Sequence, residues 1–239
     1  MKTLKLFFFI LASMAITSLL FLSCVRGKGD VVTQTVQIDP FTGIDNRISA
    51  DIYVKHAAVQ SVDISAQQNI INHIKLSVND GIWAIKFDKN NVTHFEPIVI
   101  HISIPKLSSL DVSGSGNIYM ENNFDSCGII KLNVSGSGNI DAYLNSFSKT
   151  YTTISGSGNI NLNGSSPDHD INVSGSGNVH AFPFHTLRSV VSISGSGLCE
   201  VTADSTLNVS ISGSGDVYYK GHPDITTNIS GSGNIHNSN

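Results

Sequence analysis

The sequence has little positive charge in its second half and lacks the motifs of common catalytic sites. Residues 110–239 contain four Lys or Arg and ten Asp or Glu residues, and with no basic cluster they do not favour nucleic-acid binding. There is no Gly-x-Ser-x-Gly nucleophile elbow, and the glycine-rich segments lack the Lys of a phosphate-binding loop. The nine His residues show no metal-ligand spacing. We therefore expect no enzyme activity, no cofactor and no metal site.

What the second half does contain is a repeat. Ser-Gly-Ser-Gly occurs seven times, and successive copies start 18 to 22 residues apart. A period near twenty residues is typical of a solenoid, in which each coil buries its apolar face only against its neighbours. The copies begin at Ser113, Ser135, Ser155, Ser174, Ser194, Ser212 and Ser230.

Apolar columns flank each copy. Counted from the first Ser as zero, positions −3, −1, +5 and +7 hold 25 apolar residues in 28 places, and the positions between them are mostly polar. This alternation indicates two short strands joined at a corner. Since no helical pattern lies between copies, we predict an all-β fold, a right-handed parallel β-helix (β-solenoid) with coils of about 20 residues.

The corner is expected to need glycine, because stacked corners must share one backbone path. We expect positive φ at the second Gly of a copy, such as Gly177. The Asn that follows most copies is expected to form a hydrogen-bonded ladder from coil to coil, interrupted at Leu198 and Asp216. The corner glycines are Gly114, Gly116, Gly136, Gly138, Gly156, Gly158, Gly175, Gly177, Gly195, Gly197, Gly213, Gly215, Gly231 and Gly233.

The beginning of the chain indicates export. Lys2 and Lys5 precede an apolar stretch, residues 6–22, which is followed by Ser23 and Cys24. This is the order of a lipoprotein signal peptide (residues 1–23), with lipidation at Cys24 and a linker over residues 24–30. The alternative is an uncleaved membrane anchor, because seventeen apolar-rich residues reach the lower limit for a span. Both place the remainder outside the cytoplasm, and a lipid anchor in the outer membrane is our first expectation.

Two further cysteines occur, Cys127 and Cys199. Cys199 falls in the buried +5 column, and Cys127 lies three coils away, about 14 Å along the expected rod. A disulfide needs Cα atoms within about 7 Å, so we expect both thiols to be free.

Residues 31–109 lack the tetrapeptide and are predicted to form irregular opening coils and a cap, continuous with a solenoid over residues 110–239. Residues 48–54 match the first copy if their corner is three residues shorter. Asn79-Asp80-Gly81 indicates a turn between two strands, residues 98–104 a strongly apolar strand, and residues 67–74 a brief helical turn. At the other end, an open coil edge favours self-association.

The polar column at position +6 is the candidate ligand face. Asp141 and Glu200 on this face are expected about 14 Å apart, beyond the 5 to 9.5 Å of paired glycosidase carboxylates. His180 lies next to Glu200, and the tyrosines of the column can stack on sugar rings. The candidate face comprises Tyr119, Asp141, Asn161, His180, Glu200 and Tyr218.

With its lipobox-like Phe21-Leu22-Ser23-Cys24, the Ile48–Val54 segment and the seven copies, the chain resembles the putative auto-transporter adhesin family, head GIN domain. The resemblance implies an exported, often lipid-anchored bacterial β-helix, and it brings no catalytic residues. We expect a non-enzymatic envelope lipoprotein that presents a surface for adhesion or assembly, with a glycan or surface protein as ligand. Alternatives are a carbohydrate-binding or carbohydrate-cleaving β-helix and, less favoured, an ice-binding solenoid.

Overall fold

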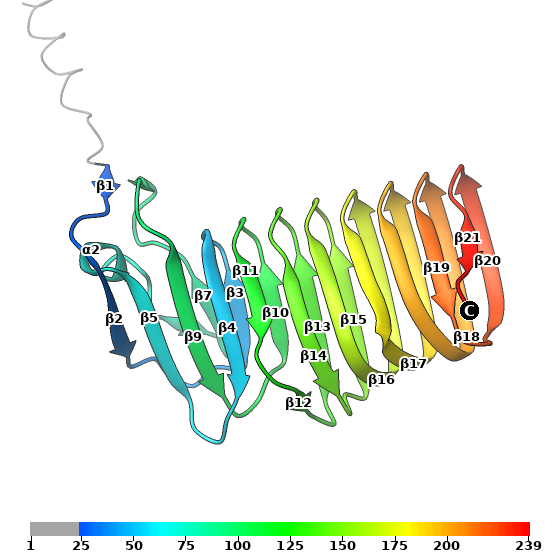
Figure 1. Cartoon of the computed structure of the whole chain (residues 1–239), viewed down its shortest axis with the longest axis horizontal. Helices are drawn as coiled ribbons and strands as arrows, with labels where there is room; N and C mark the ends of the chain where they lie inside the picture. Colours follow the sequence, from blue (N-terminus) through cyan, green and yellow to red (C-terminus); the bar gives the residue numbers. More distant parts are fainter. Residues whose placement is uncertain (1–23) are drawn as a thin grey trace, which may run out of the picture.

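The computed structural model describes residues 24–239 and shows a rod of stacked β-coils (Figure 1). The signal peptide expected over residues 1–23 lies outside the described residues. Each coil pairs in parallel with the next, so that paired residues lie about one coil length apart in the sequence. The prediction of a parallel β-solenoid is thus confirmed.

One long side of the rod, sheet A, carries the strand that follows each corner. Its neighbours pair in parallel from β9 onward, whereas β2 and β5 pair antiparallel at the first end. In spatial order the strands are β2 (Val31–Val36), β5 (Ser61–Gln67), β9 (Ile98–Ile104), β4 (Ala50–His56), β11 (Asn117–Met120), β14 (Ile140–Asn145), the first parts of β16 (Asn159–Gly175), β17 (Asn178–Gly195) and β18 (Leu198–Gly213), then β19 (Asp216–Lys220) and β21 (Ile235–Asn237).

The opposite side, sheet B, carries the strand that precedes each corner. The long strands β16, β17 and β18 continue around the rod and contribute their second parts to this sheet. In spatial order it contains β7 (Ile82–Ile85), β3 (Gly43–Asn46), β10 (Ser109–Val112), β13 (Ile129–Val134), β15 (Lys149–Ile154), the second parts of β16 to β18, and β20 (Asp224–Gly231).

The opening coils are irregular, as predicted. β6 (Val78–Asn79) and β7 form a hairpin whose turn has positive φ at Asp80 and Gly81. The expected helical turn is α2 (Gln68–Ile71), which buries Ile70 and Ile71 at the first end of the rod. Short strands complete the set: β1 (Val25–Arg26), β8 (Val92–Thr93) and β12 (Phe124–Asp125).

The coils do not stack in chain order at this end. β4 lies between β9 and β11, so the coil of β3 and β4 is sandwiched between a later coil and the first perfect copy. The stack therefore runs without a break across residue 109. The corner before β4 is also not shortened. Asn46 pairs with Val112 and Asp51 with Asn117, so the corner at residues 47–50 is as long as the corner at residues 113–116. Our alignment of Ile48 with Val112 was wrong.

Asn46 explains the misalignment. It occupies a column that the later copies fill with Val or Ile, yet it is fully buried. Its side chain donates to the carbonyl of Ala50 at 2.8 Å and accepts from the amide of Ile48 at 3.3 Å. A buried amide is tolerated when its hydrogen bonds are satisfied, and here it holds a corner that has no Ser-Gly-Ser-Gly.

The core is formed by the predicted apolar columns. Val134, Ile154, Ile160 and Val179 each expose 1% or less of their surface, and full burial of such a side chain contributes roughly 1.5–3 kcal/mol. Cys199 is buried in the +5 column, Cys127 is exposed, and both thiols are free as predicted.

The corners require glycine because of close stacking rather than because of φ at every position. A Cβ on Gly177 would lie 2.3 Å from the carbonyl oxygen of Gly158 and 2.6 Å from Ile154 Cγ2. Positive φ occurs at the first Gly of the later copies, 150° in Gly175 and 149° in Gly195, and not at Gly177. The expected positive φ at the second Gly was therefore wrong.

The asparagine ladder forms beside these corners. Asn139 donates its amide to Oδ1 of Asn117, and Asn159 to Oδ1 of Asn139, both at 3.0 Å. Asn178 continues it onto Asn159 at 3.0 Å. At Leu198 only the backbone N–H reaches the Oδ1 of Asn178, so the ladder breaks where it was predicted to break.

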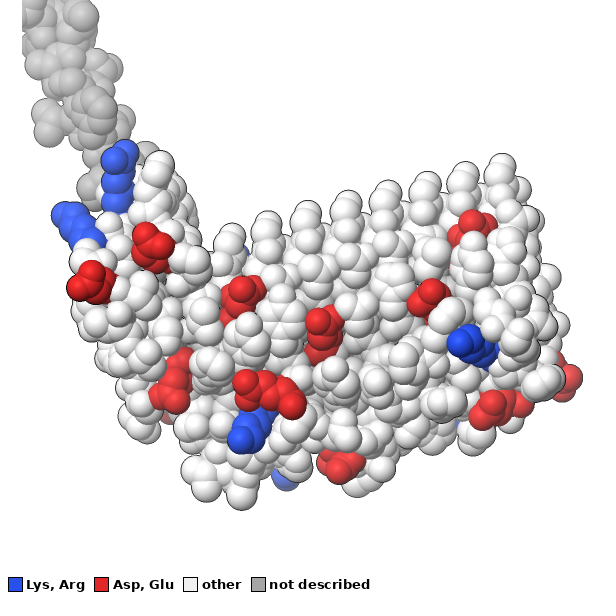
Figure 2. All heavy atoms as spheres, in the orientation of Figure 1, with Lys and Arg blue, Asp and Glu red and all other residues white. Residues whose placement is uncertain are grey.

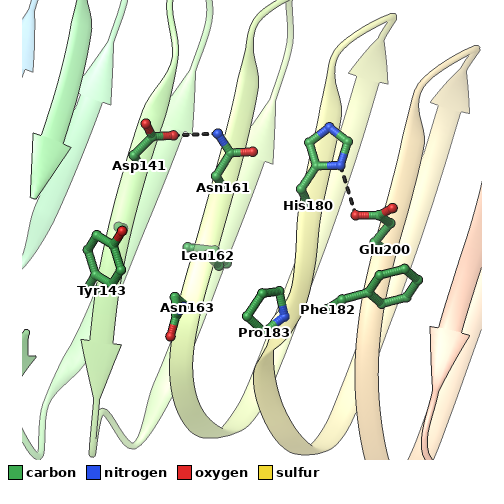
Figure 3. Close-up of a pocket in the computed structure, with 10 residues that line it drawn as sticks. Asp141, Tyr143, Asn161, Leu162, Asn163, His180, Phe182, Pro183 and Glu200 are labelled. Atoms are coloured by element: carbon green, nitrogen blue, oxygen red, sulfur yellow. Dashed lines mark hydrogen bonds and ion pairs between the residues drawn. The ribbon is translucent and has the colours of Figure 1, made fainter.

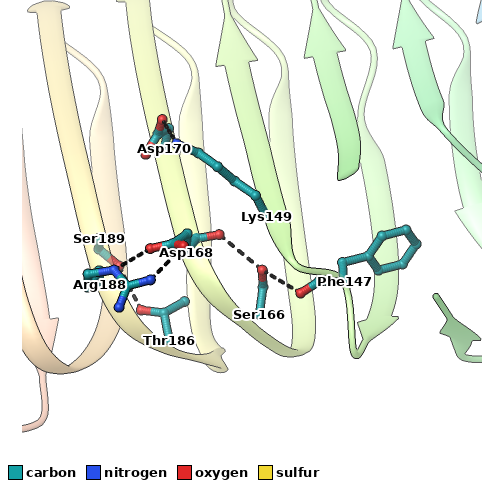
Figure 4. A network of polar contacts seen from close by, with 8 residues as sticks. All are labelled: Phe147, Lys149, Ser166, Asp168, Asp170, Thr186, Arg188 and Ser189. Carbon is teal, nitrogen blue, oxygen red and sulfur yellow. Dashed lines mark hydrogen bonds and ion pairs between the residues drawn. The ribbon is translucent and has the colours of Figure 1, made fainter. Parts of the chain in front are cut away.

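Ion pairs link neighbouring coils where the strands of sheet B begin (Figure 4). Arg188 contacts both carboxylate oxygens of Asp168 at 2.6 and 2.7 Å, and Lys149 lies 2.6 Å from Asp170. Next to them Ser166, which is buried, donates to the carbonyl of Phe147. The arrangement satisfies polar groups where the chain turns between the two sheets.

Candidate functional site

The six residues of the candidate ligand face form one continuous row on the outside of sheet A. Each pairs with the next across adjacent strands, so neighbours are one coil apart, about 4.8 Å. In order along the rod they are Tyr119, Asp141, Asn161, His180, Glu200 and Tyr218.

Aromatic rings extend the row at both ends. Tyr53 stacks on Tyr119 with ring centroids 5.3 Å apart and on His101 at 5.0 Å. At the other end His236 stacks on Tyr218 at 4.6 Å. Partial burial, followed by the nearby Asp51 and Asp141, raises the pKa of the Tyr119 hydroxyl, which therefore stays protonated.

A bulge in β17 lies beside the middle of the row, just after His180. β17 has three residues, 181–183, where β16 has two, and residues 182–184 have no partner in β18. Pro183 fits this place because proline, which has no N–H, is tolerated at bulges. The carbonyl of Phe182 is not left unpaired, since Thr202 donates to it at 2.8 Å.

The bulge bounds a groove of about 500 Å³ on sheet A (Figure 3). Tyr143 of β14, 41% exposed, lies at one end, and Pro183 and Phe182 lie at the other, with the smaller Asn163 between them. Lys220 lies 4.5 Å from the centroid of the Phe182 ring and contacts it through a cation–π interaction.

Four polar residues of the row form the upper edge of the groove in Figure 3. Asn161 donates to the Oδ1 of Asp141, and Nδ1 of His180 lies 2.9 Å from Glu200 Oε2. These contacts orient the side chains while leaving the second carboxylate oxygens, the amide carbonyl of Asn161 and Nε2 of His180 available to a ligand.

The two carboxylates of the row lie too far apart to act together as a glycosidase pair. Asp141 and Glu200 are three coils apart, about 14 Å, and each is paired with a different partner. Glycosidase carboxylates act at roughly 5 to 9.5 Å. Across residues 24–239, three or more His, Cys, Asp or Glu side chains nowhere gather as a metal site would require.

Sequence reasoning located the polar edge and missed the walls. Tyr143 and Asn163 follow the +6 row by two residues and so point outward as well, a signal that was present in the alternation. The bulge at Phe182 and Pro183 left one signal, the proline itself, because proline inside a sheet is confined mainly to edges and bulges.

Charged residues are sparse on the side of the rod seen in Figure 2. Figure 2 shows single acidic and basic residues scattered over mostly uncharged surface, with no basic patch on the visible side of the rod. Within residues 24–239, no helix is both long enough and apolar enough to cross a bilayer.

The comparisons with known proteins agree with the fold. A family model described as "Putative auto-transporter adhesin, head GIN domain" matches residues 40–223. The chain belongs to this family. The comparison with curated proteins gives no match.

Solved structures support the same architecture in this adhesin family. A putative adhesin from Bacteroides fragilis superposes with a TM-score of 0.80 at 24% identity, covering 89% of this chain and 99% of that one. A protein described as a putative lipid binding protein, from Parabacteroides distasonis, gives a TM-score of 0.75 at 22% identity, covering 91% and 100%. At these identities the likeness establishes the fold alone. The family and these two proteins are described as putative adhesins and as a putative lipid binding protein.

Proposed function

We propose that the chain is a non-enzymatic lipoprotein of the cell envelope whose solenoid presents sheet A for adhesion. The observation that carries the proposal is the groove at Tyr143, Asn163 and Pro183, which lies on the outer face of sheet A directly beside the row of the candidate ligand face. Rows of identical spacing on a rigid stack hold binding groups at fixed separations, and this reduces the conformational entropy lost on binding.

The two ends of the rod suit this role. Cys24 is exposed and lies beside β1 and β8, with its Sγ 2.8 Å from Thr93 Oγ1, at the end opposite β21 (Figure 1). A lipid attached at Cys24, which we propose to lie in the outer membrane, leaves the groove several coils away from the bilayer. Adhesins need their binding surface to clear the membrane in this way.

Lipidation is tested by metabolic labelling with an alkyne fatty acid. The wild-type protein is expected to be labelled and to stay with the membrane fraction, and Cys24→Ala to be unlabelled. An unlabelled wild-type protein that keeps residues 1–23 would support the uncleaved anchor instead, and labelling of Cys24→Ala would show that Cys24 is not the acylated residue.

Adhesion is tested in cells by deleting the gene and measuring attachment to glycan-coated surfaces and to other cells. We expect attachment to fall on deletion and to return with the wild-type gene. Protease treatment of intact cells, which should remove the rod, reports whether it faces outward. Unchanged attachment on all surfaces would contradict the adhesion proposal.

A further inference from the structure

We propose that the groove on sheet A is a saccharide-binding site for a neutral, extended oligosaccharide lying along the rod axis. The inference rests on the proposed function for its biological meaning, and it names the ligand class of the same site. It is carried by four features of the described residues: spacing, wall chemistry, polar edge and charge.

The spacing suits a polymer. Asp141, Asn161, His180 and Glu200 present one polar group per coil, about 4.8 Å apart, and a pyranose unit advances a chain by a similar distance. A groove that stays open on the sheet surface can accept units beyond its own length, whereas a small isolated ligand is normally enclosed on most sides.

The walls suit sugar rings. Tyr143 exposes 41% of its surface, and Pro183 is also exposed at the bulge. Both side chains are flat, rigid and only weakly polar, so they can pack against the C–H face of a sugar at little cost in side-chain entropy. Phe182 is held in place by Lys220 and by the bond from Thr202 to its carbonyl.

The polar edge suits hydroxyl groups. Carboxylates and amides are planar, and each can bind two neighbouring hydroxyls of a sugar, the carboxylates as acceptors and the amide as donor and acceptor. The pairs Asp141–Asn161 and His180–Glu200 fix these planes before a ligand arrives. Preorganised donors and acceptors lose less freedom when they bind.

Charge selects among saccharides. The groove edge carries two carboxylates, Asp141 and Glu200, and no Lys or Arg is among the described residues that line the groove. Lys220, which contacts the Phe182 ring, is engaged in a cation–π interaction. Uronate or sulfate groups would meet like charges here, and like charges placed opposite one another disfavour a partner. A neutral chain of hexoses or N-acetylhexosamines avoids this repulsion.

The test uses the purified protein on an array of immobilised oligosaccharides that are neutral, acetamido-substituted, uronate-containing or sulfated, followed by calorimetry with the best binder. We expect binding of neutral or acetamido chains, with affinity rising from two to four sugar units and then levelling off, because four coils line the groove. Tyr143→Ala is expected to weaken binding by about tenfold, since loss of a stacked aromatic contact costs on the order of 1.4 kcal/mol.

Matched controls lie on sheet B. Tyr151→Ala and Asn172→Ala remove the same residue types as Tyr143→Ala and Asn161→Ala, and all four variants should keep the melting temperature of the wild type. Only the two on sheet A should lose affinity. Failure of every neutral chain to bind, stronger binding of acidic chains, or equal effects of the variants on both sheets would overturn the assignment.

The cell experiment separates this inference from the proposed function. If deletion abolishes attachment but a Tyr143→Ala protein restores it fully, adhesion stands and the groove is not its site. If the protein binds neutral oligosaccharides through the groove while deletion leaves attachment unchanged, the saccharide site stands and the adhesive role fails.

Discussion

The imidazole of His169 lies inside the solenoid, with Nε2 2.8 Å from Oγ1 of Thr152 on the preceding coil. The ring exposes 1% of its surface and packs edge-on against Phe184. Burial lowers its pKa from 6.5 to about 3, so His169 is neutral in the folded protein at neutral pH.

This histidine predicts acid sensitivity. Because the folded-state pKa lies below that of the unfolded chain, the unfolded state binds more protons below pH 6.5, and the free energy of unfolding falls as pH drops toward 3. The loss should be about 1.6 kcal/mol between pH 6.5 and 5. Chemical denaturation at several pH values measures it.

The variant His169→Leu should flatten this dependence, and His185→Gln on the surface should leave it as in the parent. An equally steep loss of stability in His169→Leu would assign the acid sensitivity to other groups.

Gly177 predicts the cost of crowding a corner. In Gly177→Val the Cβ would overlap the carbonyl of Gly158, and overpacking of this kind destabilises by about 1–3 kcal/mol or more. Ser176→Ala, an exposed change in the same corner, should have little effect. Thermal melting of both variants tests this prediction. Equal melting temperatures would show that the stacked corners can move apart to make room for the Val side chain.

The asparagine ladder predicts opposite effects of two substitutions. Asn159→Ala removes the side-chain hydrogen bonds to Asn139 and Asn178. The carbonyl of Asn139 keeps the backbone N–H of residue 159, but the partly buried amide of Asn178 loses its acceptor, at a cost of about 1–3 kcal/mol. Leu198→Asn should extend the ladder onto Asn178 and stabilise by about 0.5–1 kcal/mol. Urea denaturation measures both, and a destabilised Leu198→Asn would show that packing at Leu198 outweighs the missing bond.

The two cysteines should differ in reactivity. Burial, and to a smaller extent Glu200, raises the pKa of the Cys199 thiol, and only the thiolate attacks alkylating reagents. In the folded protein a maleimide should therefore label exposed Cys127 and spare Cys199, which should react after denaturation. Mass spectrometry of the labelled peptides would contradict the assigned burial if Cys199 reacted as fast as Cys127.

The regular part of the rod could be predicted because its evidence repeats. A column such as Val134, Ile154 and Val173 identifies an inward position seven times over, whereas a single strand identifies it once. The ladder was predictable for the same reason, and so were its breaks at Leu198 and Asp216.

What could not be predicted depends on contacts between unlike segments. Nothing in residues 43–56 indicates that a later strand, β9, pairs with β4 on the far side, and Asn46 in a core column was misread because its bonds are local. The wall at Phe182 and Pro183 was missed because the bulge changes the backbone path without disturbing the flanking columns.

The position of β4 between β9 and β11 also bears on how the chain assembles. Both neighbours of β4 in the sheet come from later in the sequence, β9 at residues 98–104 and β11 at residues 117–120. Pairing between segments that are distant in the sequence is slow. Each later coil instead finds the template just completed by its predecessor. We therefore expect one slow nucleation step confined to residues 31–120, followed by rapid addition of coils. Evolution could then lengthen or shorten the distal rod one repeat at a time without disturbing that nucleus.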